Sequence, residues 1–305
     1  MLRVLFVVTT LVSLPLTRPS AQQAVFRAET DLVSFGVTVN DRRGNFVTDL
    51  VAADFEIVED GKPQTLKYFV RGDQGDAAPE LHIGLLFDTS GSMTADINIA
   101  RTAAIKLLNA LPEAKDITLV DFDSEVRLAK YEAGDFPRLV ERIRSRKPEG
   151  FTAVYDALGQ YLNVAEGDDG RKILVLYSDG GDTRSALGFT DVMTLLRGSD
   201  VTVYSIGFMA NQPQSARGSQ SMRMGQIATE SGGEAFFPIT MKEIETAYER
   251  IVTQVRSQYT IGYVSTNTAQ DGRWRKVEIK IRRPDLKNVR IQTRKGYFGP
   301  FKASR

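Results

Sequence analysis

Hydrophobic positions change their spacing twice along the 305-residue chain. From about residue 24 to 72, apolar and polar residues alternate, which is typical of strands that bury one face. Between about 81 and 255, continuous apolar runs alternate with segments in which apolar residues recur every three or four positions. After residue 257 the single-residue alternation returns. The pattern therefore predicts two β-segments that flank an α/β segment.

The central segment predicts a sheet covered by helices. Its apolar runs are of the kind that is buried on both faces of a sheet. The predicted strands are HIGLLFD, ITLVDFD, KILVLYS and VTVYSIGF. The predicted helices are ADINIARTAAIKLLNALP, FPRLVERIRS, TAVYDALGQYLNVAEG, FTDVMTLLRG, MGQIATESGG and MKEIETAYERIVTQVRS. Because strands and helices alternate, we expect a doubly wound, mostly parallel α/β sheet over residues 78–256.

The two flanking segments have few strands each. Their alternating apolar positions are Val33, Phe35, Val37 and Val39 in the first and Val277, Ile279 and Ile281 in the second. Asp60-Gly61 lies between two apolar runs and predicts a hairpin turn. Small isolated sheets are marginally stable. We therefore expect residues 22–75 and 257–305 to pack together as one antiparallel β-sandwich, into which the α/β domain is inserted.

The first 21 residues have the layout of a secretory signal peptide. Arg3 precedes an apolar run over residues 4–16, and a small residue, Ala21, offers a cleavage point. The run is shorter than the ~20 residues that a membrane-spanning helix needs. We therefore expect an exported protein, periplasmic or secreted to the cell surface, with no stable membrane insertion after cleavage.

Composition removes several classes of function. The formal net charge is +1, which does not favour binding to nucleic acid or to an anionic membrane. The chain has no cysteine, which excludes disulfides, thiol catalysis and cysteine-ligated zinc. The fold must therefore be stabilised by its hydrophobic core.

Oxygen-bearing side chains follow two of the predicted buried strands. Asp88, Ser90 and Ser92 come at the end of the first α/β strand, Asp179 follows the third, and Thr152 stands directly before a helix. In a doubly wound sheet, ligands bind beyond the carboxyl ends of the strands, where strand order reverses. Two carboxylates and three hydroxyls at that edge suit Mg²⁺, although oxygen donors alone do not rank it above Mn²⁺ or Ca²⁺.

The residue pattern as a whole is Asp88-x-Ser90-x-Ser92, then Thr152, then Ser178-Asp179-Gly180. This order and spacing resemble the metal-ion-dependent adhesion site (MIDAS) of von Willebrand factor type A (VWFA) domains, over about residues 81–255. The flanking stretches DFEIVEDGKPQ, Y-x-x-x-Y, DGRWRKVEIKI and GYF resemble those of a bacterial exported VWFA-related group.

The resemblance implies a role for each site residue. Ser90 and Ser92 would bind the metal directly, and Asp88 directly or through water. Thr152 would bind it directly in the ligand-bound form, and Asp179 mostly through water. The open coordination position would take an Asp or Glu carboxylate from a partner protein. The resemblance therefore implies a metal-dependent adhesion or protein-binding module.

Three other interpretations fit the residues less well. A serine hydrolase needs a base, but the only histidine, His82, opens its strand at the end away from Ser90. Phosphotransfer on Asp88 would want a second carboxylate where Ser90 stands. We therefore expect no enzyme activity, a metal-dependent hydrolase being the least favoured alternative. The remaining alternative is a scaffold in envelope assembly whose metal only holds loops together. The acidic DFD at 121–123 is expected to cap a strand or lie on the rim.

Overall fold

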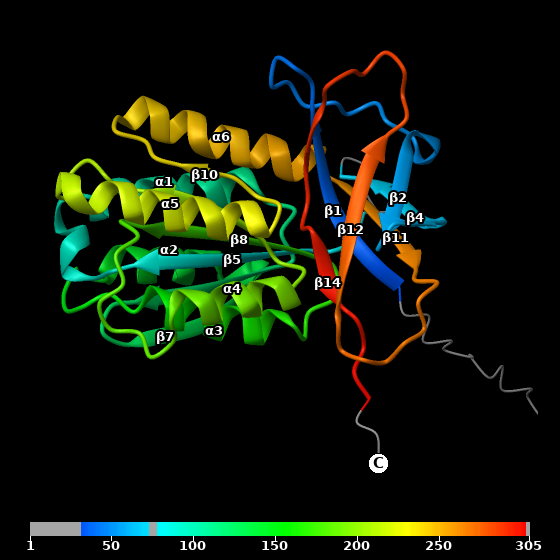
Figure 1. Ribbon diagram of the computed structural model, residues 1–305. Coiled ribbons are helices and arrows are strands. Elements are labelled where there is room, and N and C mark those ends of the chain that lie inside the picture. The colour runs from blue at the N-terminus through cyan, green and yellow to red at the C-terminus, as the bar shows by residue number, and fades with distance from the viewer. Residues whose placement is uncertain (1–31, 73–77, 303–305) are drawn as a thin grey trace, which may run out of the picture. The chain divides into compact units, whose positions relative to one another are not determined.

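The computed structural model describes residues 32–72 and 78–302, and these fall within one compact unit. The predicted signal peptide at residues 1–21 lies outside the described residues. Figure 1 shows an α/β part, with helices on both faces of a sheet, and an antiparallel part built from both ends of the described chain. Within the described residues, no helix has the length and apolar character needed to cross a bilayer.

The central sheet is mixed. Its strands are β5 (Leu81–Asp88), β6 (Asp116–Phe122), β7 (Val126–Glu132), β8 (Arg171–Ser178), β9 (Thr202–Gly207) and β10 (Ala235–Phe236). The strand order is β10-β9-β8-β5-β6-β7. All neighbouring pairs are parallel except β6 and β7. The expected doubly wound, mostly parallel sheet is thereby confirmed, and strand order reverses at β5, between β8 and β6.

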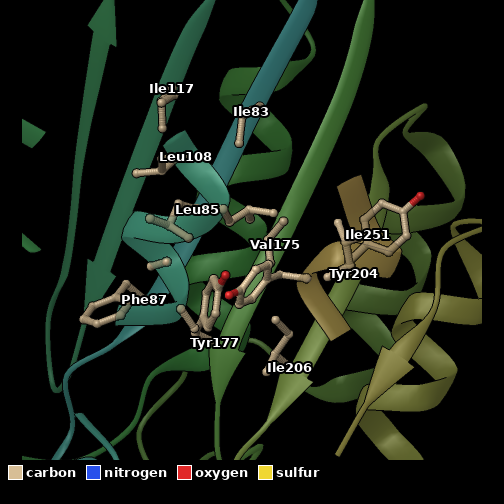
Figure 2. Packing of buried hydrophobic residues seen from close by; sticks show 14 of the residues in the cluster. Ile83, Leu85, Phe87, Leu108, Ile117, Val175, Tyr177, Tyr204, Ile206 and Ile251 are labelled. Carbon is tan, nitrogen blue, oxygen red and sulfur yellow. The ribbon is translucent and has the colours of Figure 1, made fainter. Parts of the chain in front are cut away.

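Helices cover both faces of this sheet. They are α1 (Ile97–Ala110), α2 (Phe136–Ser145), α3 (Val154–Ala165), α4 (Phe189–Gly198), α5 (Gln214–Glu230) and α6 (Met241–Ser257), with short 3₁₀ turns η1 (Ala52–Asp54), η3 (Gly91–Ala95) and η4 (Ala133–Asp135). One hydrophobic cluster joins α1, α2 and α6 to the sheet, and a second joins α3, α4 and α5 to its other face. Figure 2 shows the first cluster, in which Leu85 and Val175 of the central strands lie between Leu108 of α1 and Ile251 of α6.

Three elements differ from the expectation, the first being the two-residue strand β10, which was not predicted. Strand β7 was not predicted, because its side chains are mostly half-buried and VRLAKYE shows no clear alternation. It pairs only with β6 and forms the antiparallel edge of the sheet. Helix α5 begins at Gln214, ten residues before the predicted segment MGQIATESGG, since its first turns carry small and polar residues with few buried positions.

Two four-stranded antiparallel sheets form the rest of the structure. Their strands are β1 (Leu32–Asn40), β2 (Phe55–Glu59), β3 (Lys62–Gln64), β4 (Leu66–Arg71), β11 (Tyr259–Val264), β12 (Trp274–Ile281), β13 (Arg290–Gln292) and β14 (Gly296–Phe298). The orders are β13-β1-β11-β4 and β14-β12-β2-β3. One hydrophobic cluster holds residues from both sheets, including Phe35 and Val37 of β1 and Ile57 and Val277 of the other sheet.

Strands from the two ends of the chain therefore pair with each other. β1 pairs with β11 and β13, and β2 pairs with β12. Both terminal segments also change sheet within a few residues, since β3 and β4 are separated by Thr65 alone and belong to different sheets. The domain boundaries at 22–75, 78–256 and 257–305 stay predictions.

A buried polar network connects the terminal segments. The Glu59 carboxylate of β2 is 2% exposed and accepts hydrogen bonds from the hydroxyls of Tyr263 (2.7 Å), Tyr297 (2.9 Å) and Ser265 (2.7 Å). Arg275 of β12, also 2% exposed, donates to Ser265 Oγ (3.2 Å) and to the Tyr297 hydroxyl (3.3 Å). These residues lie in or beside the flanking sequence motifs, so the network is a physical reason for the motifs to occur together.

The β2–β3 turn gives a first prediction. Asp60 and Gly61 have φ values of 47° and 80°, as a two-residue type I′ turn requires. Gly61→Ala should lower the free energy of unfolding by about 1 kcal/mol, because an L-residue is strained in the left-handed region. Urea denaturation measures the change. Gly134→Ala is the control, since Gly134 lacks a positive φ and has open space around it. Equal effects of both substitutions would contradict the argument.

Candidate metal centre

The predicted site lies at the carboxyl end of the central strands. Asp88 is the last residue of β5, and Asp179 directly follows β8, the neighbouring strand. Asp88 is fully buried and Asp179 is 2% exposed. The two carboxylates are therefore placed at the point where strand order reverses, which is where doubly wound sheets bind ligands.

The first loop brings three of the predicted residues together. The Asp88 carboxylate accepts hydrogen bonds from the Ser90 amide (2.9 Å) and from the Ser178 hydroxyl (2.6 Å). The hydroxyls of Ser90 and Ser92 are 3.0 Å apart. Ser90 is buried and Ser92 is exposed, so the hydroxyl pair leads from the interior to the surface. Asp88, Ser90 and Ser92 thus form one oxygen cluster that solvent reaches.

Asp179 completes the charge of the site. Its carboxylate accepts hydrogen bonds from the Gly181 amide (3.1 Å) and from Gln212 Nε2 (2.7 Å). Burial and, to a lesser degree, the negative charge of Asp179 raise the pKa of Asp88 to about 7, although the hydrogen bonds from Ser178 and Ser90 lower it. Among the described residues, neither carboxylate has an ion pair with Lys, Arg or His. Two buried acids therefore share one edge with neutral donors only.

Thr152 is tied to both acidic loops. Its amide donates to the Thr183 hydroxyl (3.0 Å), and its carbonyl accepts from the amides of Thr183 (2.9 Å) and Arg184 (3.0 Å). On the other side, the Gly91 amide donates to the Gly150 carbonyl at 3.1 Å. The side chain of Thr152 is buried. The three loops that carry the predicted residues are therefore joined by backbone hydrogen bonds.

The donor set fits a hard divalent cation. Carboxylate and hydroxyl oxygens are the ligands that Mg²⁺ and Ca²⁺ prefer, and the set contains no sulfur or imidazole. Buried carboxylates without a counter-charge are costly, and a cation would offset that cost. The residues present therefore match the ion that their pattern predicts.

Sequence reasoning missed Gln212. This residue lies in the loop between β9 and α5, and its side-chain amide donates a hydrogen bond to one carboxylate oxygen of Asp179. The adjacent Asn211 donates to both carboxylate oxygens of Asp96 (2.9 and 3.1 Å), just before α1. One loop thus contacts the segments that follow both acidic strands. Two amides outside any motif gave no signal in the sequence.

The DFD acids, expected to cap a strand or lie on the rim, are both buried: Asp121 lies within β6 and Asp123 directly follows it. The Asp121 carboxylate is bonded by Arg127 Nε (2.8 Å), Arg142 Nε (2.7 Å) and Arg146 Nε (2.9 Å). Asp123 is bonded by Arg127, which lowers the pKa of Asp123 against the effect of burial. Their charges are matched by arginine, so they are not free to bind a metal.

A second acidic group lies at the other end of the strands. In the described part of the chain, His82, Asp116 and Asp168 are the one group of three histidine or acidic side chains close enough to share a metal. Lys130 Nζ already lies 3.1 Å from Asp116 and 2.8 Å from Asp168. His82 Nδ1 is 2.9 Å from Asp116, and both residues stand at the starts of their strands. Lys130 already supplies a positive charge to these acids. Because the group lies at the starts of the strands, it is separate from the predicted centre at their carboxyl ends.

The fold is a doubly wound α/β domain, and oxygen-bearing side chains cluster at the sheet edge where strand order reverses. Residues 82–253 match the von Willebrand factor type A domain family. This stretch is more than half of the chain, and the chain belongs to that family. No curated protein matches the sequence.

Solved structures with a similar fold share little sequence. The pilus adhesin SpaC from Lactobacillus rhamnosus GG, in its open conformation, is 11% identical (TM-score 0.51; 81% of this chain, 48% of that chain). The PilB minor pilin from Streptococcus sanguinis is 15% identical (TM-score 0.49; 61% and 63%). The vWF domain of the type V pili tip protein Mfa5 from Porphyromonas gingivalis is 13% identical (TM-score 0.48; 58% and 95%). The chain thus spans less than two thirds of PilB and about half of SpaC.

Proposed function

We propose that this chain is an exported protein-binding module of the adhesion type. A divalent cation held by Asp88, Ser90, Ser92, Thr152 and Asp179 would complete its coordination with an Asp or Glu carboxylate of a partner protein. The observation that carries the proposal is the pair of buried carboxylates, Asp88 and Asp179, whose hydrogen-bond partners are all neutral.

The composition of the ligand set explains why the cation would attract an anion. Two carboxylates balance a divalent charge, while the hydroxyls of Ser90, Ser92 and Thr152 add donors without adding charge. When bound, Mg²⁺, or Mn²⁺ or Ca²⁺ in its place, supplies a positive centre that an acidic side chain can bind. Because Ser92 is exposed, a cation held by it would lie near the surface, where a macromolecule could reach it.

We propose binding rather than catalysis. A nucleophilic serine needs a base within hydrogen-bond reach. Among the described residues, the Ser90 hydroxyl contacts Ser92 and the Ser90 amide donates to Asp88. His82 is bonded to Asp116 and to the Asp169 carbonyl at the opposite end of the strands. Export rests on the signal-peptide pattern at residues 1–21, with the periplasm or the cell surface as the destination.

Capture of a partner tests the proposal. The mature chain is immobilised and exposed to envelope extract of the cells that produce it, with Mg²⁺ or with EDTA. Capture should require Mg²⁺, be lost in Asp88→Asn, and persist in Glu245→Gln, which removes an exposed carboxylate on α6. Elution with EDTA and recovery on adding Mg²⁺ or Mn²⁺ complete the test. Equal capture with and without the cation would leave the metal only the role of holding loops together.

A further inference from the structure

Two exposed side chains flank Thr152, one beside it in the chain and one across a loop contact. Phe151 is 64% exposed, although it is a large apolar residue. Arg184 is also exposed, and its amide donates to the Thr152 carbonyl at 3.0 Å. The backbone next to this predicted metal ligand therefore carries an exposed phenylalanine on one side and an exposed arginine on the other.

The backbone of both residues is held in place. The Phe151 amide donates to Ser124 Oγ (2.9 Å), and the Thr183 and Arg184 amides share the Thr152 carbonyl. Fixed backbones lose little conformational entropy when a partner binds. The backbone positions from which Phe151 and Arg184 extend are thus fixed next to Thr152, the predicted ligand.

The charge of Arg184 is unmatched within the described residues, where its guanidinium has no hydrogen bond or ion pair. The carboxylate of the nearby Asp182 accepts hydrogen bonds from the Tyr155 amide (3.1 Å) and from the Ser185 hydroxyl (2.6 Å). The guanidinium of Arg217 donates instead to carbonyls in the loop before α5. Arg184 is therefore a cation available to a partner on the β8 side of the site.

The β6 side of the same edge carries mixed charges. Glu149 and Lys147 are both exposed in the loop before Thr152, and the exposed Glu125 lies 3.7 Å from Arg127. An anionic partner group is thus attracted more toward the β8 side, where Arg184 stands, than toward the β6 side.

We infer that the partner presents an acidic peptide segment in which a second carboxylate follows the metal-binding one and pairs with Arg184, while an apolar part of the segment packs on Phe151. The inference rests on the proposed function, because it assumes that a partner carboxylate reaches the cation. Aromatic side chains beside a charged contact are typical of residues that dominate binding.

Two capped peptides test the inference, AGEADLA and AGEANLA, in which leucine supplies the apolar part; they are immobilised on a biosensor and probed with the mature protein in Mg²⁺. Wild type should bind the aspartate peptide about threefold more tightly, as expected for one exposed ion pair. Arg184→Ala should bind both peptides equally, and Arg184→Lys should keep part of the preference. Phe151→Ala should weaken both by about tenfold. Arg42→Ala, another exposed arginine in the turn after β1, is the matched control and should behave as wild type.

Each contrary outcome has a distinct meaning. An unchanged preference in Arg184→Ala overturns the inference while leaving the proposed function intact. Absence of Mg²⁺-dependent binding of either peptide by wild type, with Mn²⁺ affinity retained, counts against the proposed function itself. Mg²⁺-dependent binding of polygalacturonate in place of the peptides assigns the surface to an acidic glycan and overturns the peptide inference.

Discussion

Asp88→Asn should abolish high-affinity metal binding without unfolding the protein. The substitution removes one of two carboxylates, so the affinity for Mn²⁺ or Mg²⁺ should fall more than about 100-fold, beyond the effect of losing an outer-sphere partner. In EDTA the melting temperature should equal that of wild type or exceed it by about 2–4 °C, because burial and Asp179 both disfavour the Asp88 charge. Calorimetric titration and melting curves give the two quantities.

The gain in stability on adding Mg²⁺ should also differ between wild type and Asp88→Asn. At saturating Mg²⁺, about 100 times the dissociation constant, wild type should gain about 2.7 kcal/mol of stability by mass action, and Asp88→Asn should gain almost none. Glu245→Gln on α6 should respond to Mg²⁺ as wild type does. A variant that still melts at a higher temperature with Mg²⁺ would place the cation elsewhere, and global unfolding of wild type in EDTA would make the metal primarily structural.

Glu59→Ala should destabilise the antiparallel sheets strongly. The side chain is buried and is the common acceptor for Tyr263, Tyr297 and Ser265. Its loss leaves the buried hydroxyls of Tyr263 and Tyr297 without their acceptor and leaves a cavity, which together should cost about 3–5 kcal/mol. Urea denaturation followed by tyrosine and tryptophan fluorescence measures the loss.

Two further variants identify the cause. Glu59→Gln keeps an acceptor oxygen of similar size and should cost less than half as much. Glu56→Ala, three residues earlier on β2, breaks only the half-exposed contact with Arg282 and should have a small effect. Equal losses in Glu56→Ala and Glu59→Ala would mean that the network contributes nothing beyond ordinary strand pairing.

The sequence predicted the features that depend on burial and local turn chemistry. Continuous apolar runs such as HIGLLFD became strands buried on both faces, and the Asp60-Gly61 pair became a turn with two positive φ values. The pairing of strands that are far apart in the sequence could not be predicted in the same way. Nothing in the residues around Thr65 indicates that β3 and β4 belong to different sheets, because that division depends on which partner strand each one meets.

The site shows the same division. Asp88, Ser90 and Ser92 lie together as their spacing predicts, because a short loop after a strand leaves little freedom. Gln212 could not be predicted, since its contact with Asp179 spans 33 positions and depends on how the β9–α5 loop folds back. The role of the five residues as metal ligands stays a prediction.

The pairing of β1 with β11 has a consequence for the order of folding. Val33 faces Tyr263, and Ile57 faces Ile279, so these strands meet partners that are synthesised some two hundred residues later. Topologies with such distant contacts fold slowly. Until about the last sixth of the chain emerges, β1 and β2 present open strand edges that can pair with other chains. A chain halted after residue 256 would therefore carry a complete central sheet beside β1, β2 and β4, which would lack their partners β11 and β12, and aggregation would begin at those strands.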